Sequence, residues 1–245
     1  HEEEAMVQAV QAAFPRIVVV LNTGGMMDTV WFKDNSKIQS ALLAWQAGIE
    51  GGLATADILC GDVCPSGHLT DTFAVNFAAY PSSDTFNESE DYVTYNEDIF
   101  VGYRYFETIP GAAEKVCYPF GYGLSYTSFE ITGATAKMEA DQITVTAKVT
   151  NTGAVAGKHV VQVYCQNNGS ANAPRNPRLC AFQRINCPAG STVKVTLTVS
   201  KEALKVVNDN GELIEEGSPV LYAGVGQPDS RTAALTGHEA LSIEL

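Results

Sequence analysis

The stretch Ile143-Thr-Val-Thr-Ala-Lys-Val149 decides the fold of the C-terminal half, because apolar and polar side chains alternate in it without a break. A period of two is typical of a β-strand with one buried face and one solvated face. Asn151-Thr-Gly153 and Asn208-Asp-Asn-Gly211 provide turn residues on either side of further strands. Those further strands are predicted at His159–Tyr164, Thr192–Val199 and Pro219–Val225. Short strands separated by turn signals predict an antiparallel β-sandwich over residues 127–245.

The N-terminal part of the chain has a different pattern, in which helical and strand-like segments alternate. Helices are predicted at residues 5–13 and 50–60, the second closed by Gly61, and strands at Ile17–Leu21, Ala41–Trp45 and His68–Phe73. The β-branched run Ile17–Leu21 is of the kind found in strands buried on both faces. Alternation of helix and buried strand predicts parallel β-α-β units, although about two or three strands are too few for a complete doubly wound sheet.

The predicted fold class is therefore α/β followed by all-β. A partial parallel α/β sandwich layer over residues 1–80 is joined to a fibronectin III/immunoglobulin-like β-sandwich over residues 127–245. Between them, residues 81–126 are rich in Tyr, Asn, Asp, Pro and Gly and predict an extended connecting segment.

Composition excludes several classes of function. The net charge of −13 repels phosphate, so nucleic acid and anionic membrane surfaces are poor partners and a neutral substrate is favoured. No apolar run approaches the roughly 20 residues that span a bilayer, and His1-Glu-Glu-Glu4 does not resemble a signal peptide. The six cysteines are expected to be free thiols, mostly buried, because a chain of this size can bury a core without disulfides.

A nucleophilic triad is suggested by Ser66, His68 and Asp71 but is not supported by their context. The Gly-x-Ser-x-Gly turn of a nucleophile elbow is absent, and a strand over these residues would place His68 and Asp71 on opposite faces. A turn followed by a strand is the preferred interpretation. His68, His159 and His238 are far apart in the sequence and indicate no metal site.

Three polar residues that follow the predicted strands are candidates for the rim of a ligand site: Thr23, Asp28 and Glu50. Glu50 lies just past a strand's carboxyl end, where open α/β sheets bind ligands. The favoured alternative is that its carboxylate caps the free N–H groups of the helix that follows. Thr23 lies in the loop Asn22–Gly25, and the segment Met26–Asp28 that follows this loop is expected to face a neighbouring domain.

Six motifs, taken in order, resemble the C-terminal portion of glycoside hydrolase family 3, the family of many β-glucosidases and β-xylosidases. They are Val18–Gly25, Ala44–Gly52, Ala56–Gly67, Tyr95–Phe106, Tyr118–Tyr126, and Val149–Gly153 leading through Gly157 to Val160–Tyr164. One departure is Gln46-Ala-Gly-Ile-Glu50, where many relatives have Pro-Gly-Gln-Glu. This departure weakens a substrate assignment for that loop.

The resemblance implies a three-part enzyme with a (β/α)8 barrel, an α/β sandwich and a fibronectin-III-like domain. In that family the barrel supplies an aspartate nucleophile, and a Gly-Glu-Gly loop of the most similar members supplies the acid/base glutamate. A retaining mechanism requires these two carboxylates about 5 Å apart. No Gly-Glu-Gly occurs in this sequence, so both catalytic carboxylates are expected outside the chain. Because some relatives are circularly permuted, the barrel is expected either before or after this segment.

The predicted function is thus the non-catalytic C-terminal part of a retaining β-glycosidase, in particular a β-glucosidase acting on terminal β-D-glucosyl residues. The resemblance implies a β-glucoside or oligosaccharide substrate, the barrel of the same enzyme as partner and no cofactor, and it leaves a homo-oligomer open. The alternative is an autonomous carbohydrate-binding or structural interaction module, since such sandwiches serve many roles. A structural role ranks above carbohydrate binding here, because both tryptophans lie in the α/β part.

Overall fold

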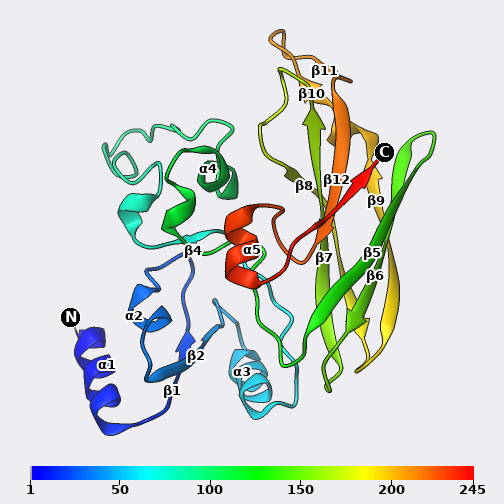
Figure 1. Ribbon diagram of the computed structural model, residues 1–245. Coiled ribbons are helices and arrows are strands. Elements are labelled where there is room, and N and C mark those ends of the chain that lie inside the picture. Colours follow the sequence, from blue (N-terminus) through cyan, green and yellow to red (C-terminus); the bar gives the residue numbers. More distant parts are fainter. Residues whose placement is uncertain (1) are drawn as a thin grey trace. The chain divides into compact units, whose positions relative to one another are not determined.

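The computed structural model describes residues 2–245, which form two compact units (Figure 1). The first unit comprises residues 1–63 and 73–94, and the second comprises residues 64–72 and 95–245. The chain therefore enters the second unit for nine residues at Cys64–Thr72, returns to the first, and enters the second again at Tyr95.

The first unit is a small α/β layer, as the sequence predicts. Its elements are α1 (Glu2–Ala13), β1 (Ile17–Leu21), α2 (Val30–Lys33), β2 (Ile38–Leu43), α3 (Gly51–Cys60), β3 (Phe73–Ala74) and the 3-10 turn η1 (Phe77–Ala79). Strands β1 and β2 pair in parallel, with Leu21 opposite Leu43, and α2 lies in the connection between them. The predicted parallel pairing of the first two strands is confirmed, but the helix between them was not predicted, and the second strand lies at Ile38–Leu43 instead of Ala41–Trp45.

Strand β1 is not buried on both faces within the described chain, so that prediction is wrong. Val18 is 50% exposed and Val20 43% exposed, while Ile17, Val19 and Leu21 on the alternate face are half-buried. Helix α1 likewise has no buried residue. The composition of β1 suits burial on both faces, but the residues described here cover only one of them.

The end of α3 follows the local chemistry of its sequence. Gly61 adopts a left-handed conformation, with φ of 85°, that residues with a Cβ atom seldom adopt. Its N–H donates to the Ile58 carbonyl at 3.0 Å, and Asp62 N donates to the Asp57 carbonyl at 2.9 Å. These bonds satisfy the last carbonyls of the helix, which is how a glycine C-cap stops an α-helix.

The strand predicted at His68–Phe73 is absent, and only Phe73–Ala74 forms a short strand. Segment 64–72 is instead held as an irregular loop of the second unit. Leu69 N donates to the Tyr122 carbonyl at 2.8 Å, and Gly121 N donates to the Leu69 carbonyl at 2.7 Å. A turn in residues 119–122 thus satisfies this backbone in place of a sheet.

The second unit contains a β-sandwich preceded by short helical elements. In chain order, the helices and strands of this unit are α4 (Tyr103–Thr108), η2 (Ala113–Lys115), β4 (Val116–Tyr118), β5 (Phe129–Met138), β6 (Gln142–Asn151), β7 (Gly157–Asn168), β8 (Arg178–Cys187), β9 (Thr192–Ser200), η3 (Lys201–Leu204), β10 (Val206–Val207), β11 (Leu213–Ile214), β12 (Ser218–Gly224), α5 (Ser230–Thr236) and β13 (Leu241–Glu244).

Two antiparallel sheets face each other in this sandwich (Figure 1). One has the strand order β5-β6-β9, and the other has the order β13-β12-β7-β8. The alternating residues of β6 point into the space between the sheets, where Ile143, Val145, Ala147 and Val149 are completely buried. The fibronectin III/immunoglobulin-like sandwich predicted from the two-residue period is confirmed.

Buried Asn151 organises the turn that follows β6. Its Oδ1 accepts hydrogen bonds from Thr127 Oγ1 at 2.5 Å and Gly153 N at 3.0 Å, and its Nδ2 donates to the carbonyls of Val155 and Cys187. A Cβ atom at Gly153 would lie 2.3 Å from Thr127 Oγ1, so only glycine fits there. A buried amide with both ends satisfied specifies one turn geometry.

The six cysteines are free; Cys117, Cys165 and Cys187 are buried, whereas Cys64 and Cys180 are half-buried and Cys60 is exposed, so only half of them have the predicted burial. Over residues 2–245, no helix has both the length and the apolar character needed to cross a bilayer.

Candidate functional site

The predicted rim residues follow two parallel strands whose carboxyl ends lie at one edge of the first unit. Ala44 N donates to the Leu21 carbonyl at 2.9 Å, which keeps the strand ends in register. A Cβ atom on Gly24 would approach Gln46 Nε2 to 2.8 Å, so the loops after β1 and β2 touch. This edge is where parallel sheets present ligand-binding loops.

Thr23 and Asp28 are occupied by local hydrogen bonds. Thr23 Oγ1 donates to the Gly25 carbonyl at 3.2 Å and stabilises the loop after β1. Asp28 Oδ1 accepts from Val30 N at 2.9 Å, and the Asp28 carbonyl accepts from Trp31 Nε1 at 3.0 Å. The carboxylate of Asp28 is exposed and thus supports the start of α2 while remaining open to solvent.

Glu50 is the N-cap residue of α3, but its side chain makes no capping hydrogen bond. The favoured prediction, that this carboxylate satisfies the free N–H groups of the helix, is therefore wrong. A φ of −86° and ψ of 4° take the residue out of the extended conformation from which a side chain reaches back to the helix. The Glu50 carboxylate projects from the exposed loop at the strand edge, where it is available to a ligand or a neighbouring domain.

Trp45, in the same loop, was not identified as a site residue from the sequence. Its φ of 53° is unusual for a bulky side chain, and the ring meets Phe73 edge-on at a centroid distance of 6.5 Å. Such backbone strain concentrates at binding loops. No sequence signal marks it, because residue type alone does not report φ.

The residues of the suggested triad do not form a nucleophilic site. Ser66 Oγ accepts two hydrogen bonds from the Arg184 guanidinium, at 2.6 and 3.1 Å. His68 Nδ1 lies 3.1 Å from the Ser66 carbonyl, and Asp71 is exposed. The preference for a structural role of Ser66 agrees with its place in a clamp between segment 64–72 and β8.

A carboxylate pair that sequence reasoning missed is formed in the second unit by Glu107 on α4 and Asp229, the N-cap of α5. Gln227 Nε2 donates to Glu107 Oε1, and Asp229 Oδ1 accepts from Thr232 N at 2.9 Å. The second oxygen of each carboxylate is buried without a partner among the described residues. Burial, reinforced by the Asp229 charge, raises the pKa of Glu107 to about 8 despite the Gln227 hydrogen bond.

The cavity between these groups cannot hold a sugar. Glu107, Asp229 and Arg231 line it, and its volume is about 10 Å³, which is room for about one water molecule. Ligand pockets are typically some 300–1,000 Å³. A raised carboxyl pKa next to a second carboxylate is a feature of catalytic sites, but here it occurs in a closed structural cluster.

Two of the histidines that are scattered in the sequence come together in the second unit. The rings of His68 and His159 meet edge-on with centroids 5.1 Å apart, and His159 also stacks on Phe129 at 4.7 Å. Within residues 2–245, no group of three or more His, Cys, Asp or Glu side chains is arranged to hold a metal ion.

The chain matches two family models in sequence. Residues 1–126 match the glycosyl hydrolase family 3 C-terminal domain, and residues 159–226 match the fibronectin type III-like domain. The first match includes the α/β layer, and the second lies within the β-sandwich.

Named relatives agree with these matches. Beta-glucosidase A of Butyrivibrio fibrisolvens is 43% identical over 251 residues, which cover 94% of this chain and 30% of that protein. An exo-alpha-(1->6)-L-arabinopyranosidase of Bifidobacterium longum is 36% identical over 92% of this chain and 30% of its own length. A beta-glucosidase structure from Paenibacillus barengoltzii superposes with a TM-score of 0.84 at 32% identity, over 99% of this chain and 26% of that one. The chain thus spans less than a third of the length of these relatives.

Proposed function

We propose that this chain, which belongs to glycosyl hydrolase family 3, is the C-terminal part of a β-glucosidase that hydrolyses terminal β-D-glucosyl residues with retention of configuration. The observation that carries the proposal is the family match over residues 1–126, followed in the chain by the fibronectin type III-like match. The 43% identity to a β-glucosidase over nearly the whole chain supports the choice of sugar.

The nucleophile and the acid/base residue of this enzyme are proposed to lie outside the chain. Retaining hydrolysis needs two carboxylates about 5 Å apart beside a sugar ring. Glu107 and Asp229 line a cavity of about 10 Å³, which excludes a sugar. The chain corresponds to only 30% of a similar β-glucosidase, which leaves most of that enzyme's length for a catalytic barrel.

The proposed role of the first unit is to pack against the rest of the enzyme and to form part of the rim of its substrate cleft. Strand β1 leaves Val18 and Val20 exposed, whereas parallel sheets are normally covered on both faces. The proposed partner is the remainder of the same enzyme, including its (β/α)8 barrel. The acidic net charge favours a neutral glycoside over nucleic acid or an anionic membrane as the other partner.

Complementation tests this proposal. The 245-residue chain alone is expected to have no activity on an aryl β-glucoside, and co-expression with the remainder of the enzyme is expected to restore it. A Val18→Glu change should prevent recovery by placing a charge on the proposed interface, whereas the matched Val155→Glu change on an exposed sandwich loop should not. Turnover by the chain alone, or a stable complex without activity, would contradict the proposal.

The rim assignment of Thr23, Asp28 and Glu50 is tested in the assembled enzyme. Glu50→Gln is expected to raise KM about tenfold with little change in kcat, because a charge-assisted hydrogen bond to substrate contributes similarly before and during reaction. Glu239→Gln, an exposed change in the sandwich unit, is the control. Equal KM values for the two variants would remove Glu50 from the rim.

A second terminal sugar deserves testing because the arabinopyranosidase of Bifidobacterium longum is 36% identical to this chain. Aryl β-glucoside and aryl α-L-arabinopyranoside should be compared in the same assay, and the β-glucoside is expected to have the higher kcat/KM. Titration of oligosaccharides against the chain by calorimetry tests the alternative of an autonomous carbohydrate-binding module. Saturable binding without the remainder of the enzyme would favour that module.

A further inference from the structure

Two cysteines meet across neighbouring strands of the sandwich at a β-bulge. Val163 on β7 pairs with Ala181 on β8, and the next residue, Tyr164, pairs with Leu179. Cys180 is therefore the extra residue of the bulge, beside the pair formed by Cys165 and Arg178. Cys165 belongs to the buried core of the sandwich, and Cys180 packs against that core.

The bulge sets Cys180 beside Cys165, and each thiol influences the pKa of the other. Each also has a backbone acceptor: Cys180 Sγ donates to the Val163 carbonyl at 3.2 Å, and Cys165 Sγ lies 3.3 Å from the Ala203 carbonyl. A disulfide requires a sulfur–sulfur distance of about 2.05 Å. The pair thus needs a local approach of two side chains on neighbouring strands.

Arg178 places a fixed positive charge beside Cys165. Its Nη2 donates to the carbonyls of Ala203 and Lys205, both at 2.6 Å, which holds the guanidinium in place. The neighbouring Cys180 thiol, together with Arg178, lowers the pKa of Cys165 below its ordinary value against the effect of burial. The Cys165 thiol and burial raise the pKa of Cys180. Cys165 is therefore the thiol of the pair that ionises more readily, and Cys180 is the one that keeps its proton longer.

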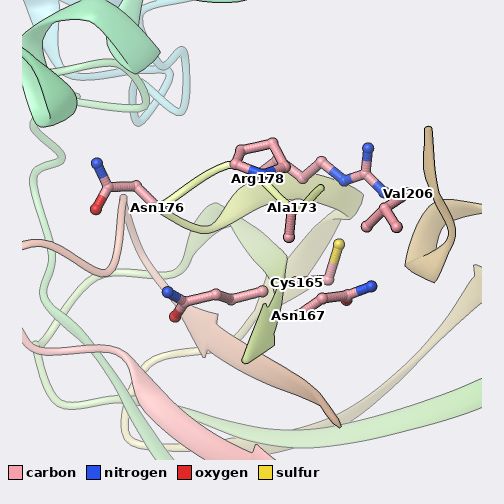
Figure 2. Close-up of a pocket in the computed structure, with 8 residues that line it drawn as sticks. Cys165, Asn167, Ala173, Asn176, Arg178 and Val206 are labelled. Carbon is pink, nitrogen blue, oxygen red and sulfur yellow. The ribbon is translucent and has the colours of Figure 1, made fainter. Parts of the chain in front are cut away.

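Cys165 and Arg178 line a small pocket. Figure 2 shows this sulfur pointing to the side of the pocket on which Arg178 and Val206 lie. The volume is about 10 Å³, so only water-sized molecules fit. Hydrogen peroxide is a two-electron thiol oxidant small enough to enter, whereas a glutathione-sized disulfide is not.

We propose that Cys165 and Cys180 form an oxidisable pair that hydrogen peroxide converts into a disulfide. The Cys165 thiolate attacks one peroxide oxygen, the O–O bond breaks, and the hydroxide that leaves is protonated to water. The Cys180 sulfur then attacks the resulting sulfenic acid, the S–O bond breaks, and hydroxide leaves as a second water with the Cys180 proton. Two thiols lose two electrons in total, and one peroxide is reduced to two waters.

Oxidation changes the link between the sandwich sheet and η3. A sulfur bonded to Cys180 no longer has the thiol proton that Cys165 directs at the Ala203 carbonyl. The disulfide joins β7 to β8 at the bulge, next to Arg178, whose guanidinium bonds to Ala203 and Lys205. The Cys165–Cys180 pair takes no part in the proposed glycoside hydrolysis. The two proposals can therefore be tested independently.

Mass spectrometry of the folded chain, and in parallel of the full-length protein that contains it, tests the pair. After hydrogen peroxide treatment and alkylation of remaining thiols, a peptide joined through Cys165 and Cys180 is expected. In Cys180→Ser, the sulfenic acid at Cys165 should persist and be trapped by dimedone. Cys187→Ser, a buried change in the same strand, should leave the joined peptide unchanged.

The effect of the Arg178 charge is tested by measuring the rate of disulfide formation. Arg178→Gln is expected to slow disulfide formation severalfold at pH 7, because loss of one of the two groups that lower the Cys165 pKa reduces the thiolate fraction. Arg178→Lys keeps a positive charge and should retain most of the rate. Oxidation of exposed Cys60 without a Cys165–Cys180 peptide would overturn the proposal, as would equal rates for both Arg178 variants.

Discussion

At the scale of single residues, His159 is a buried imidazole kept neutral by its surroundings. Its Nε2 has no hydrogen-bond partner among the described residues, and its ring lies between Phe129 and His68. Burial first, and then repulsion from His68 and His238, lowers its pKa from 6.5 to about 3. The folded state therefore favours the neutral imidazole of His159. The part of the unfolding free energy that comes from this preference is present above pH 6.5 and is lost as pH falls toward 3.

His159→Phe is expected to reduce this loss, because phenylalanine keeps the stack on Phe129 and cannot take up a proton. Urea unfolding at pH 7 and pH 4.5 should show a smaller drop in unfolding free energy for the variant than for the wild type. At pH 7 the variant should be as stable as the wild type or more so, because an unsatisfied buried nitrogen is removed. An unaltered pH dependence in His159→Phe would refute the assignment.

Glu107 predicts a pH dependence of the opposite sign. Its pKa is raised from 4.5 to about 8, so the protonated carboxyl is favoured by the fold. Stability linked to this group is fully present below pH 4.5 and is lost as pH rises toward 8, on the order of a few kcal/mol. Glu107→Gln imitates the protonated carboxyl and should reduce the fall of unfolding free energy between pH 6.5 and 8, the range above the His159 titration. Exposed Glu114→Gln is the control; if it flattens the profile equally, Glu107 is not the source.

At the scale of one element, replacing Gly52 in α3 and its C-cap residue Gly61 with alanine is expected to change stability in opposite directions. Neither Gly52 nor Gly61 has an atom within 4 Å of a Cβ built on it, but only Gly61 has a positive φ, of 85°. Gly61→Ala should destabilise the chain by about 1–2 kcal/mol, because alanine is strained in the left-handed region. Gly52→Ala should stabilise it by about 0.5–1 kcal/mol, because alanine is the better helix former. Thermal unfolding measures both, and equal effects would mean that the helix does not end at Gly61 as described.

At the scale of the whole molecule, the chain enters the second unit twice, first at segment 64–72 and again at Tyr95. This arrangement predicts that two fragments produced by a single proteolytic cut stay associated. Tyr92 and Tyr95 are 62% and 89% exposed, so limited chymotrypsin treatment should cut first near residues 92–95. The N-terminal fragment still carries segment 64–72, which bonds to Tyr122 and Arg184 of the second unit. The two fragments should therefore co-elute in native buffer and separate in urea.

Arg184→Ala should weaken this association by removing the two bonds to Ser66, whereas exposed Arg175→Ala should not. If the fragments separate without denaturant, segment 64–72 does not keep the N-terminal fragment bound to the C-terminal one. The proposed boundaries at residues 80 and 126 can be checked in the same digests, since further resistant fragments would begin or end near them.

Local patterns in the sequence determined much of this molecule. The two-residue period of Ile143–Val149 predicted β6 and the sandwich, Gly61 predicted the end of α3, and Asn208–Gly211 predicted the hairpin turn between β10 and β11. Six ordered motifs predicted the family that the comparison with known domains then supported. These features depend on backbone sterics and neighbouring side chains, which a few consecutive residues specify.

Only the tertiary structure decided where distant residues meet. Segment 64–72 is a loop, and not the predicted strand, because its backbone bonds to a turn more than 50 residues away. Glu107 with Asp229, His68 with His159, and the bulge that brings Cys180 to Cys165 likewise join groups from separate elements. Their pKa values and reactivity come from burial and from partners that sequence spacing does not reveal, because both depend on the packed fold as a whole.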